Sequence, residues 1–161
     1  MKNVLLSAAV ISFLFSCNSN TPTSEPDDPA EVAKIMIPQS SCFASASGKD
    51  TILLKIEVFP NVVTGILKYQ IEGKDRNDGT IEGKLEGNKI FADYTFSSEG
   101  KISVREVAFL INEGIATEGF GDMEEKNGKM VFKNKESIEF SKGLELDQID
   151  CVENDDKFQI K

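Results

Sequence analysis

The stretch TIEGKLEGNKIFADYTF, residues 80 to 96, carries the pattern that decides the fold. On each side of Gly87-Asn88, apolar residues such as Ile81 and Tyr94 alternate with polar or charged ones. A period of two is typical of a β-strand with one buried face, and Gly-Asn favours the positive φ angles of a two-residue hairpin turn. We therefore predict an antiparallel hairpin here.

The same alternation extends over residues 51 to 133, where the tight turns are rich in Gly, Asn and Lys. Asn127-Gly128 is the strongest of these turn signals. Residues 42–47 add a strand before this region, and short strands are predicted after it at 137–140 and 144–151. Because short connections place each strand beside its predecessor, we predict an up-and-down antiparallel meander of about eight or nine strands.

A sheet of this size with one apolar face must cover that face. Closing into a small barrel covers the apolar face and also removes the exposed edges of the sheet. The alternative is a β-sandwich, in which two sheets cover each other's apolar faces. Inward-facing glycines fit strong local curvature, because a residue without Cβ lets a strand bend. These glycines are Gly65, Gly83, Gly119 and Gly121. The predicted fold class is therefore all-β, with a barrel favoured over a sandwich.

Composition excludes several function classes. The chain has 161 residues, with 18 Lys plus Arg against 27 Asp plus Glu, and it contains no His. An acidic surface does not release counterions from phosphate, so a nucleic-acid partner is not expected. Without His, the chain lacks the imidazole base of the Ser-His and Cys-His nucleophiles and the usual zinc ligand. The acid-base residues that remain are carboxylates, and the sequence places no pair of them at working distance, so we expect no catalysis and no cofactor.

Residues 75–79, DRNDG, are similar to the start of an EF-hand calcium loop. The pattern is one residue short of the required spacing, so Glu86 falls out of register as the closing ligand. We interpret the segment as a solvated hairpin loop and predict no metal site.

The first residues have the features of an export signal. Lys2 precedes an apolar stretch, residues 4–15, that is too short to span a bilayer. The sequence then reads Leu14-Phe15-Ser16-Cys17, which resembles the lipobox of bacterial lipoproteins. The resemblance implies that residues 1–16 are a signal peptide, and that Cys17 receives diacylglycerol and an amino-terminal acyl chain such as palmitate. Asn18 resembles the pattern of lipoproteins sorted to the outer membrane, where the domain would face the periplasm or the cell surface.

Polar, proline-containing residues follow, so we interpret 17–40 as a lipidated cysteine and flexible tether. The folded domain is expected at 41–152, and 153–161 is expected to be an acidic tail. Once Cys17 is lipidated, Cys42 and Cys151 remain as an even pair. In an oxidising compartment their default state is a disulfide, and two free thiols are the alternative.

One group of polar residues is a candidate binding site: Tyr94, Glu99, Arg105 and Glu106. Arg105 has the parity of the apolar face, so its guanidinium needs a carboxylate partner or must bind an anion. The structural interpretation is an Arg-Glu pair that fixes this hairpin. The functional interpretation is an anion anchor inside a barrel.

Residues 42 to 151 resemble a group of small lipoproteins from Bacteroidota-type bacteria with a lipocalin-like barrel domain. The phrases that carry the resemblance are GILKYQIEGKDRNDGTIEG, FADYTFSSEG, SVREVAF and EGFGDMEEKNGKMVF. The resemblance implies no activity.

Two function hypotheses follow. The first is non-catalytic binding of a small apolar or amphipathic molecule, which predicts a cavity next to Arg105. The second is a protein-interaction module, such as an inhibitor of a basic envelope enzyme like lysozyme, which predicts a filled interior and an acidic patch. In either case we expect a monomer anchored to the membrane by its lipid.

Overall fold

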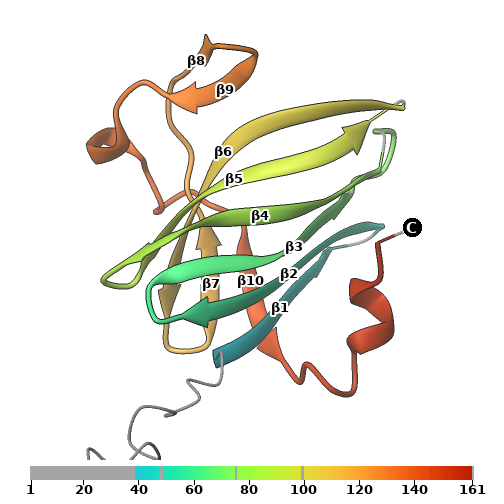
Figure 1. The fold of residues 1–161 in the computed structure, drawn as a ribbon. Helices are drawn as coiled ribbons and strands as arrows, with labels where there is room; N and C mark the ends of the chain where they lie inside the picture. Colours follow the sequence, from blue (N-terminus) through green and yellow to red (C-terminus); the bar gives the residue numbers. More distant parts are fainter. Residues whose placement is uncertain (1–38, 48, 75, 99, 161) are drawn as a thin grey trace, which may run out of the picture. The chain divides into compact units, whose positions relative to one another are not determined.

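The computed structural model describes residues 39–47, 49–74, 76–98 and 100–160 (Figure 1). The regular structure of this part is almost entirely β-strand. Its strands are β1 Gln39–Ser47, β2 Asp50–Phe59, β3 Val62–Gln70, β4 Asn77–Glu86, β5 Lys89–Ser98, β6 Lys101–Asn112, β7 Ile115–Glu118, β8 Met123–Lys126, β9 Lys129–Phe132 and β10 Glu145–Ile149. Two short 3-10 helices, η1 Lys135–Ser137 and η2 Asp155–Phe158, follow β9 and β10 respectively.

Eight of these strands form a closed antiparallel barrel. Each strand from β1 to β5 pairs with the next one in the chain, and β7 pairs with the edge of β6 that faces away from β5. β10 then inserts between β7 and β1, where Cys42 lies opposite Ile149. The predicted barrel is therefore confirmed, and the alternative sandwich is not what the chain forms.

The turns predicted at Gly87-Asn88 and Asn127-Gly128 connect β4 to β5 and β8 to β9, and a further tight turn connects β6 to β7. Asn112 pairs with Ile115 across a turn whose central residues, Glu113 and Gly114, have φ of 46° and 83°. Asn127 and Gly128 have φ of 54° and 78° in the β8–β9 turn. Two successive positive φ angles match the right-handed twist of the flanking strands, which explains the tight hairpins.

Alternate residues along the barrel strands point inward and fill the interior. Many are almost completely buried: Phe43, Leu54, Val63, Leu67, Ile81, Ile90, Tyr94, Phe109 and Leu146. The faces predicted from the period of two are therefore the faces that the core uses. Arg105 shares its face with Val107 and Phe109, as its parity predicted.

Two of the predicted inward glycines allow neighbouring strands to approach closely. A Cβ placed on Gly65 of β3 would lie 2.0 Å from the carbonyl oxygen of Lys55 in β2. A Cβ on Gly83 of β4 would lie 2.1 Å from the carbonyl oxygen of Phe91 in β5. No side chain fits there, so the curvature at these points of the barrel depends on glycine.

The β8–β9 hairpin leaves the barrel, as Figure 1 shows, and β9 runs parallel to the first half of β6. Beneath this segment lies a small second core outside the barrel, made of Ala108, Phe132 and Ile138 with Phe91, Met123 and Phe140. The prediction of a strand at 137–140 is wrong. The chain instead forms η1 and then a single bridge between Glu139 and Phe120, because Ile138 turns inward to this second core.

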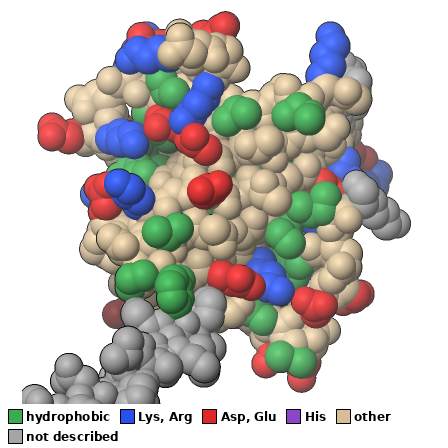
Figure 2. All heavy atoms as spheres, in the orientation of Figure 1, with side chains coloured by type: hydrophobic (Ala, Val, Ile, Leu, Met, Phe, Trp, Pro, Cys, Tyr) green, Lys and Arg blue, Asp and Glu red, His purple; other side chains and the backbone are tan. Residues whose placement is uncertain are grey.

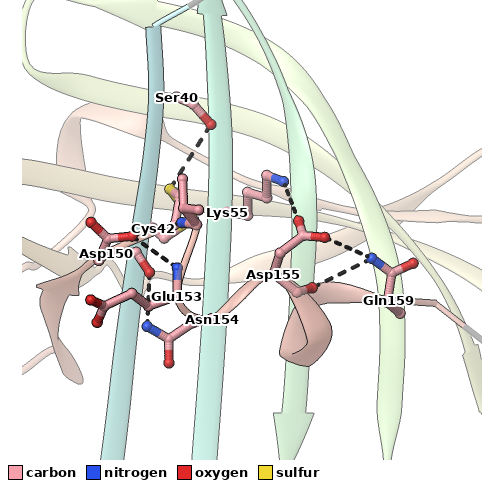
Figure 3. Close-up of polar contacts among 10 residues, drawn as sticks. Ser40, Cys42, Lys55, Asp150, Glu153, Asn154, Asp155 and Gln159 are labelled. Atoms are coloured by element: carbon pink, nitrogen blue, oxygen red, sulfur yellow. Dashed lines mark hydrogen bonds and ion pairs between the residues drawn. A yellow bond between two sulfur atoms is a disulfide. The ribbon is translucent and has the colours of Figure 1, made fainter.

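The segment after β10 packs against the outside of the barrel (Figure 3). Cys151 forms the predicted disulfide with Cys42, with Cα atoms 5.3 Å apart. Asp155 of η2 accepts a hydrogen bond from Lys55 of β2 at 3.2 Å, and Phe158 is only 1% exposed. The acidic side chains of residues 153–156 remain largely exposed, so the predicted acidic tail is a packed segment with an acidic outer face.

Candidate functional site

Arg105 lies at one end of the barrel interior, surrounded by aromatic rings. It is directly opposite Tyr94 in the β5–β6 pair. Its guanidinium carbon lies 5.2 Å from the ring centre of Tyr69, 5.7 Å from that of Tyr94 and 6.0 Å from that of Phe96. Ring faces attract a cation at these distances, so the three rings stabilise the guanidinium in a partly desolvated position.

The aromatic rings are themselves fixed. Tyr94 stacks on Phe96 with ring centres 4.7 Å apart and meets the edge of Tyr69 at 5.9 Å. The Tyr94 hydroxyl donates a hydrogen bond to the backbone oxygen of Asn77 at 3.0 Å. Burial raises the pKa of Tyr94, so its phenol keeps its proton at neutral pH. The rings therefore form a rigid wall for Arg105.

Glu118, the last residue of β7, supplies the carboxylate that faces Arg105. Its side chain is 7% exposed, and its Oε1 accepts a hydrogen bond from the Tyr69 hydroxyl at 2.6 Å. Arg105 Nη2 lies 3.9 Å from the same oxygen, which is longer than a hydrogen bond. The ion pair is therefore loose, and Tyr69 is the closer partner of the carboxylate.

Burial is the main cause that raises the pKa of the Glu118 carboxyl; the hydrogen bond from Tyr69 and the charge of Arg105 oppose it. Burial and the nearby Glu118 raise the pKa of Tyr69 well above its ordinary value. The phenol of Tyr69 therefore stays protonated and remains a donor to the Glu118 carboxylate.

Two polar atoms at this end are buried without a hydrogen-bond partner among the described residues. They are Arg105 Nε and Asn77 Oδ1. Buried polar groups are normally satisfied, so an orphaned donor beside a hollow indicates a place where a ligand can supply the missing acceptor. Side-on carboxylate binding to arginine uses Nε together with one terminal nitrogen.

The hollow is a pocket of about 500 Å³ at the barrel end. Its apolar wall includes Ile52, Ile71, Phe120 and Leu144, and its polar wall includes Ser45, Asp50, Tyr69, Lys74, Asn77, Arg105 and Glu118. Most of these residues lie near the ends of β1, β3 and β7 and the starts of β2 and β4, whereas Arg105 lies within β6 and Leu144 directly precedes β10. The pocket therefore lies among the connections at one end of the barrel. Below it the interior is filled by the core.

The structure brings together some of the predicted site residues and separates others. Tyr94 and Arg105 are in contact, whereas Glu106 points out of the barrel. There it accepts a hydrogen bond from the Phe132 backbone N–H at 2.9 Å and forms an ion pair with Lys135 at 3.4 Å. Glu106 therefore attaches the end of β9 and the start of η1 to the outside of the barrel. Glu99 and Cys17 lie outside the described residues.

Sequence reasoning missed Tyr69 and Glu118 as site residues. A signal for Glu118 was present: it alternates with buried Ala116 along β7 and so has the parity of the inner face. The acidic residues predicted beside Arg105, Glu99 and Glu106, are close to it in the chain. The actual partner comes from the strand on its other side.

Comparison with protein-family models, with curated proteins and with solved structures finds no match to this chain. Within the described ranges, no helix has the length and apolar character needed to cross a bilayer. In the same part of the chain, no three His, Cys, Asp or Glu side chains are grouped so that they could hold a metal ion.

Proposed function

We propose that the barrel binds a small amphipathic molecule, without catalysis, in the pocket at its open end. The observation that carries the proposal is Arg105, whose buried Nε lacks a partner beside a pocket of about 500 Å³. Pockets for small molecules are commonly about 300 to 1,000 Å³, largely apolar, with a few polar groups that fix orientation. This pocket has that size, and its walls combine apolar side chains with polar groups that can fix the orientation of a ligand.

The arrangement favours a ligand with an acidic head and a short apolar body. The head meets Arg105, where Nε and Nη2 can donate two parallel hydrogen bonds. The body lies against Ile52, Ile71 and Leu144. Because the core closes the barrel below the pocket, a long chain cannot pass through the interior, and the ligand's far end reaches toward solvent.

Native mass spectrometry of the purified protein tests this proposal. We expect a reproducible adduct with the unaltered protein and its loss in Arg105→Ala. A hydrogen bond to a charged group contributes about 1.5 to 3 kcal/mol, so affinity for the adduct should fall roughly 10- to 100-fold. Arg76→Ala is the matched control, because Arg76 is exposed and pairs with Asp78 at 2.9 Å. An adduct equally retained in both variants would show that Arg105 does not hold it.

A second candidate is a protein-interaction module that inhibits a basic envelope enzyme such as lysozyme. The filled interior below the pocket and the net charge of -9 favour it. The face in Figure 2, however, carries acidic and basic side chains intermixed, so this face offers no patch of a single sign. Adding lysozyme in the same experiment tests this candidate, which requires a one-to-one complex that survives physiological salt.

We also propose that the chain is a lipid-anchored protein of the outer membrane, attached through Cys17 and facing the periplasm or the cell surface. The lipobox-like sequence at residues 14–17 supports this location. The Cys42–Cys151 disulfide is consistent with it, since such bonds persist in oxidising envelope compartments and rarely in the cytosol. Two or three acyl chains, at about 0.8 kcal/mol per buried CH₂, give durable anchoring.

Metabolic labelling with a palmitate analogue tests the anchor. The full chain expressed in a bacterial host should take up the label and partition with membranes, and Cys17→Ser should lose the label because the acceptor sulfur is gone. The paired change Cys42→Ala and Cys151→Ala should keep the label, which controls for cysteine loss in general. Label retained in Cys17→Ser would rule out this attachment site.

A further inference from the structure

Within the pocket, the Arg105 guanidinium and the Glu118 carboxylate lie close to each other. Arg105 Nη2 and Glu118 Oε1 are 3.9 Å apart, and Glu118 is almost fully buried. An acidic ligand that reaches Arg105 Nε must place its own carboxylate near Glu118. Two carboxylates that share one site cannot both remain ionised at low cost, so one of them takes up a proton.

We propose that the ligand is a carboxylic acid that binds as its anion while Glu118 takes up one proton from solvent, so that acidification tightens binding. This inference rests on the proposed function of the pocket. The step makes and breaks no bond other than that to the proton, which adds to a carboxylate oxygen of Glu118. Arg105 then faces two carboxyl groups that together carry a single negative charge.

Among the residues that the structure describes, Arg105 is the charged group that contacts the Glu118 carboxylate. Tyr69 of β3 is its hydrogen-bond donor and stays protonated. Tyr94 of β5 lies against Arg105 and also keeps its proton. At the pocket rim, Asp50 already accepts a hydrogen bond from the Glu72 backbone N–H at 2.7 Å, and Lys74 is exposed.

The geometry permits the protonated form. Tyr69 donates to Oε1 at 2.6 Å, which leaves Oε2 free to carry the proton and to donate to the ligand carboxylate. Burial already raises the pKa of the Glu118 carboxyl in the free protein, and a bound anion raises it further. Between these two pKa values the complex holds a proton that the free protein lacks, so affinity rises as pH falls.

Isothermal titration calorimetry with decanoate measures this proton directly. Titrations from about pH 5.5 to about pH 8.5, in two buffers of different ionisation enthalpy, should give an uptake of between zero and one proton per decanoate bound. In the pH range where the proton is taken up, the affinity for decanoate should fall by up to about tenfold for each unit that the pH rises. This measurement needs no variant, so it does not depend on whether a substituted protein folds.

Two variants assign the proton. Glu118→Gln should lose the uptake and should bind decanoate at about pH 8 more tightly than the unaltered protein, since no charge opposes the ligand. Glu82→Gln, on the exposed face of β4, should leave the uptake as it is. An uptake that persists in Glu118→Gln would overturn the assignment to this residue.

Head-group controls separate this inference from the proposed function. Decanoate that binds without proton uptake, or decyltrimethylammonium that binds more tightly than decanoate, overturns the inference and leaves a binding pocket. If decanoate, 1-decanol and decyltrimethylammonium all fail to bind, the proposed function fails together with the inference. Binding of decanoate with uptake, absent in Arg105→Ala, supports both.

Discussion

Removal of the disulfide by the paired change Cys42→Ala and Cys151→Ala is expected to lower the free energy of unfolding by about 4 to 5 kcal/mol. The bond joins residues with a sequence separation of 109, and cross-linking so long a loop removes much of the entropy of the unfolded chain. It also ties β1 to the segment that follows β10. Urea denaturation of the two proteins under oxidising conditions gives the difference.

Reduction provides an independent control for this change. The unaltered protein treated with a reducing agent should approach the stability of the paired variant, because both lack only the cross-link. A loss below about 1 kcal/mol would mean that the unfolded chain is already compact near these cysteines, and the entropic argument would not hold for this protein.

Gly65→Ala is expected to destabilise the barrel by roughly 3 kcal/mol or more. Its Cβ would lie 2.0 Å from the Lys55 carbonyl oxygen, and the obstacle is backbone of the paired strand, which cannot rotate away as a side chain can. β2 and β3 must therefore separate locally, with loss of hydrogen bonds between them. Thermal or urea unfolding, followed by circular dichroism, measures the change.

Gly121→Ala is the matched control for this glycine. There the added Cβ would meet side-chain atoms of Phe132 and Ile138 at 3.3 and 3.4 Å, which small rotations relieve. We expect a loss of less than about 1 kcal/mol. Equal losses in the two variants would show that the close approach of β2 and β3 at Gly65 is not the source of the loss.

Local patterns allowed much of the barrel to be predicted. A period of two placed Ile81, Tyr94 and Phe109 on the inner face, and Asn127-Gly128 located a hairpin, because face and turn depend on neighbouring residues alone. The position of β10 between β7 and β1 depends on contacts between the two ends of the domain. No local pattern contains that pairing.

The site could be predicted only in part for the same reason. The parity of Arg105 indicated a guanidinium inside the barrel, and its neighbour Tyr94 followed from the hairpin. Glu118 and Tyr69 reach Arg105 from other strands, so their contact depends on how the barrel closes. Phe158 was missed because the run around it is polar, and Phe158 and Ile160 alone are too few to establish a period.

The place of β10 in the barrel sets the order in which the protein can fold. This strand is synthesised last, yet it closes the sheet, and before it docks β1 and β7 each present an unpaired edge. Contacts between distant chain ends form slowly, since the entropy of a large loop must be overcome before they contribute. An emerging chain therefore keeps an open sheet until β10 has been made.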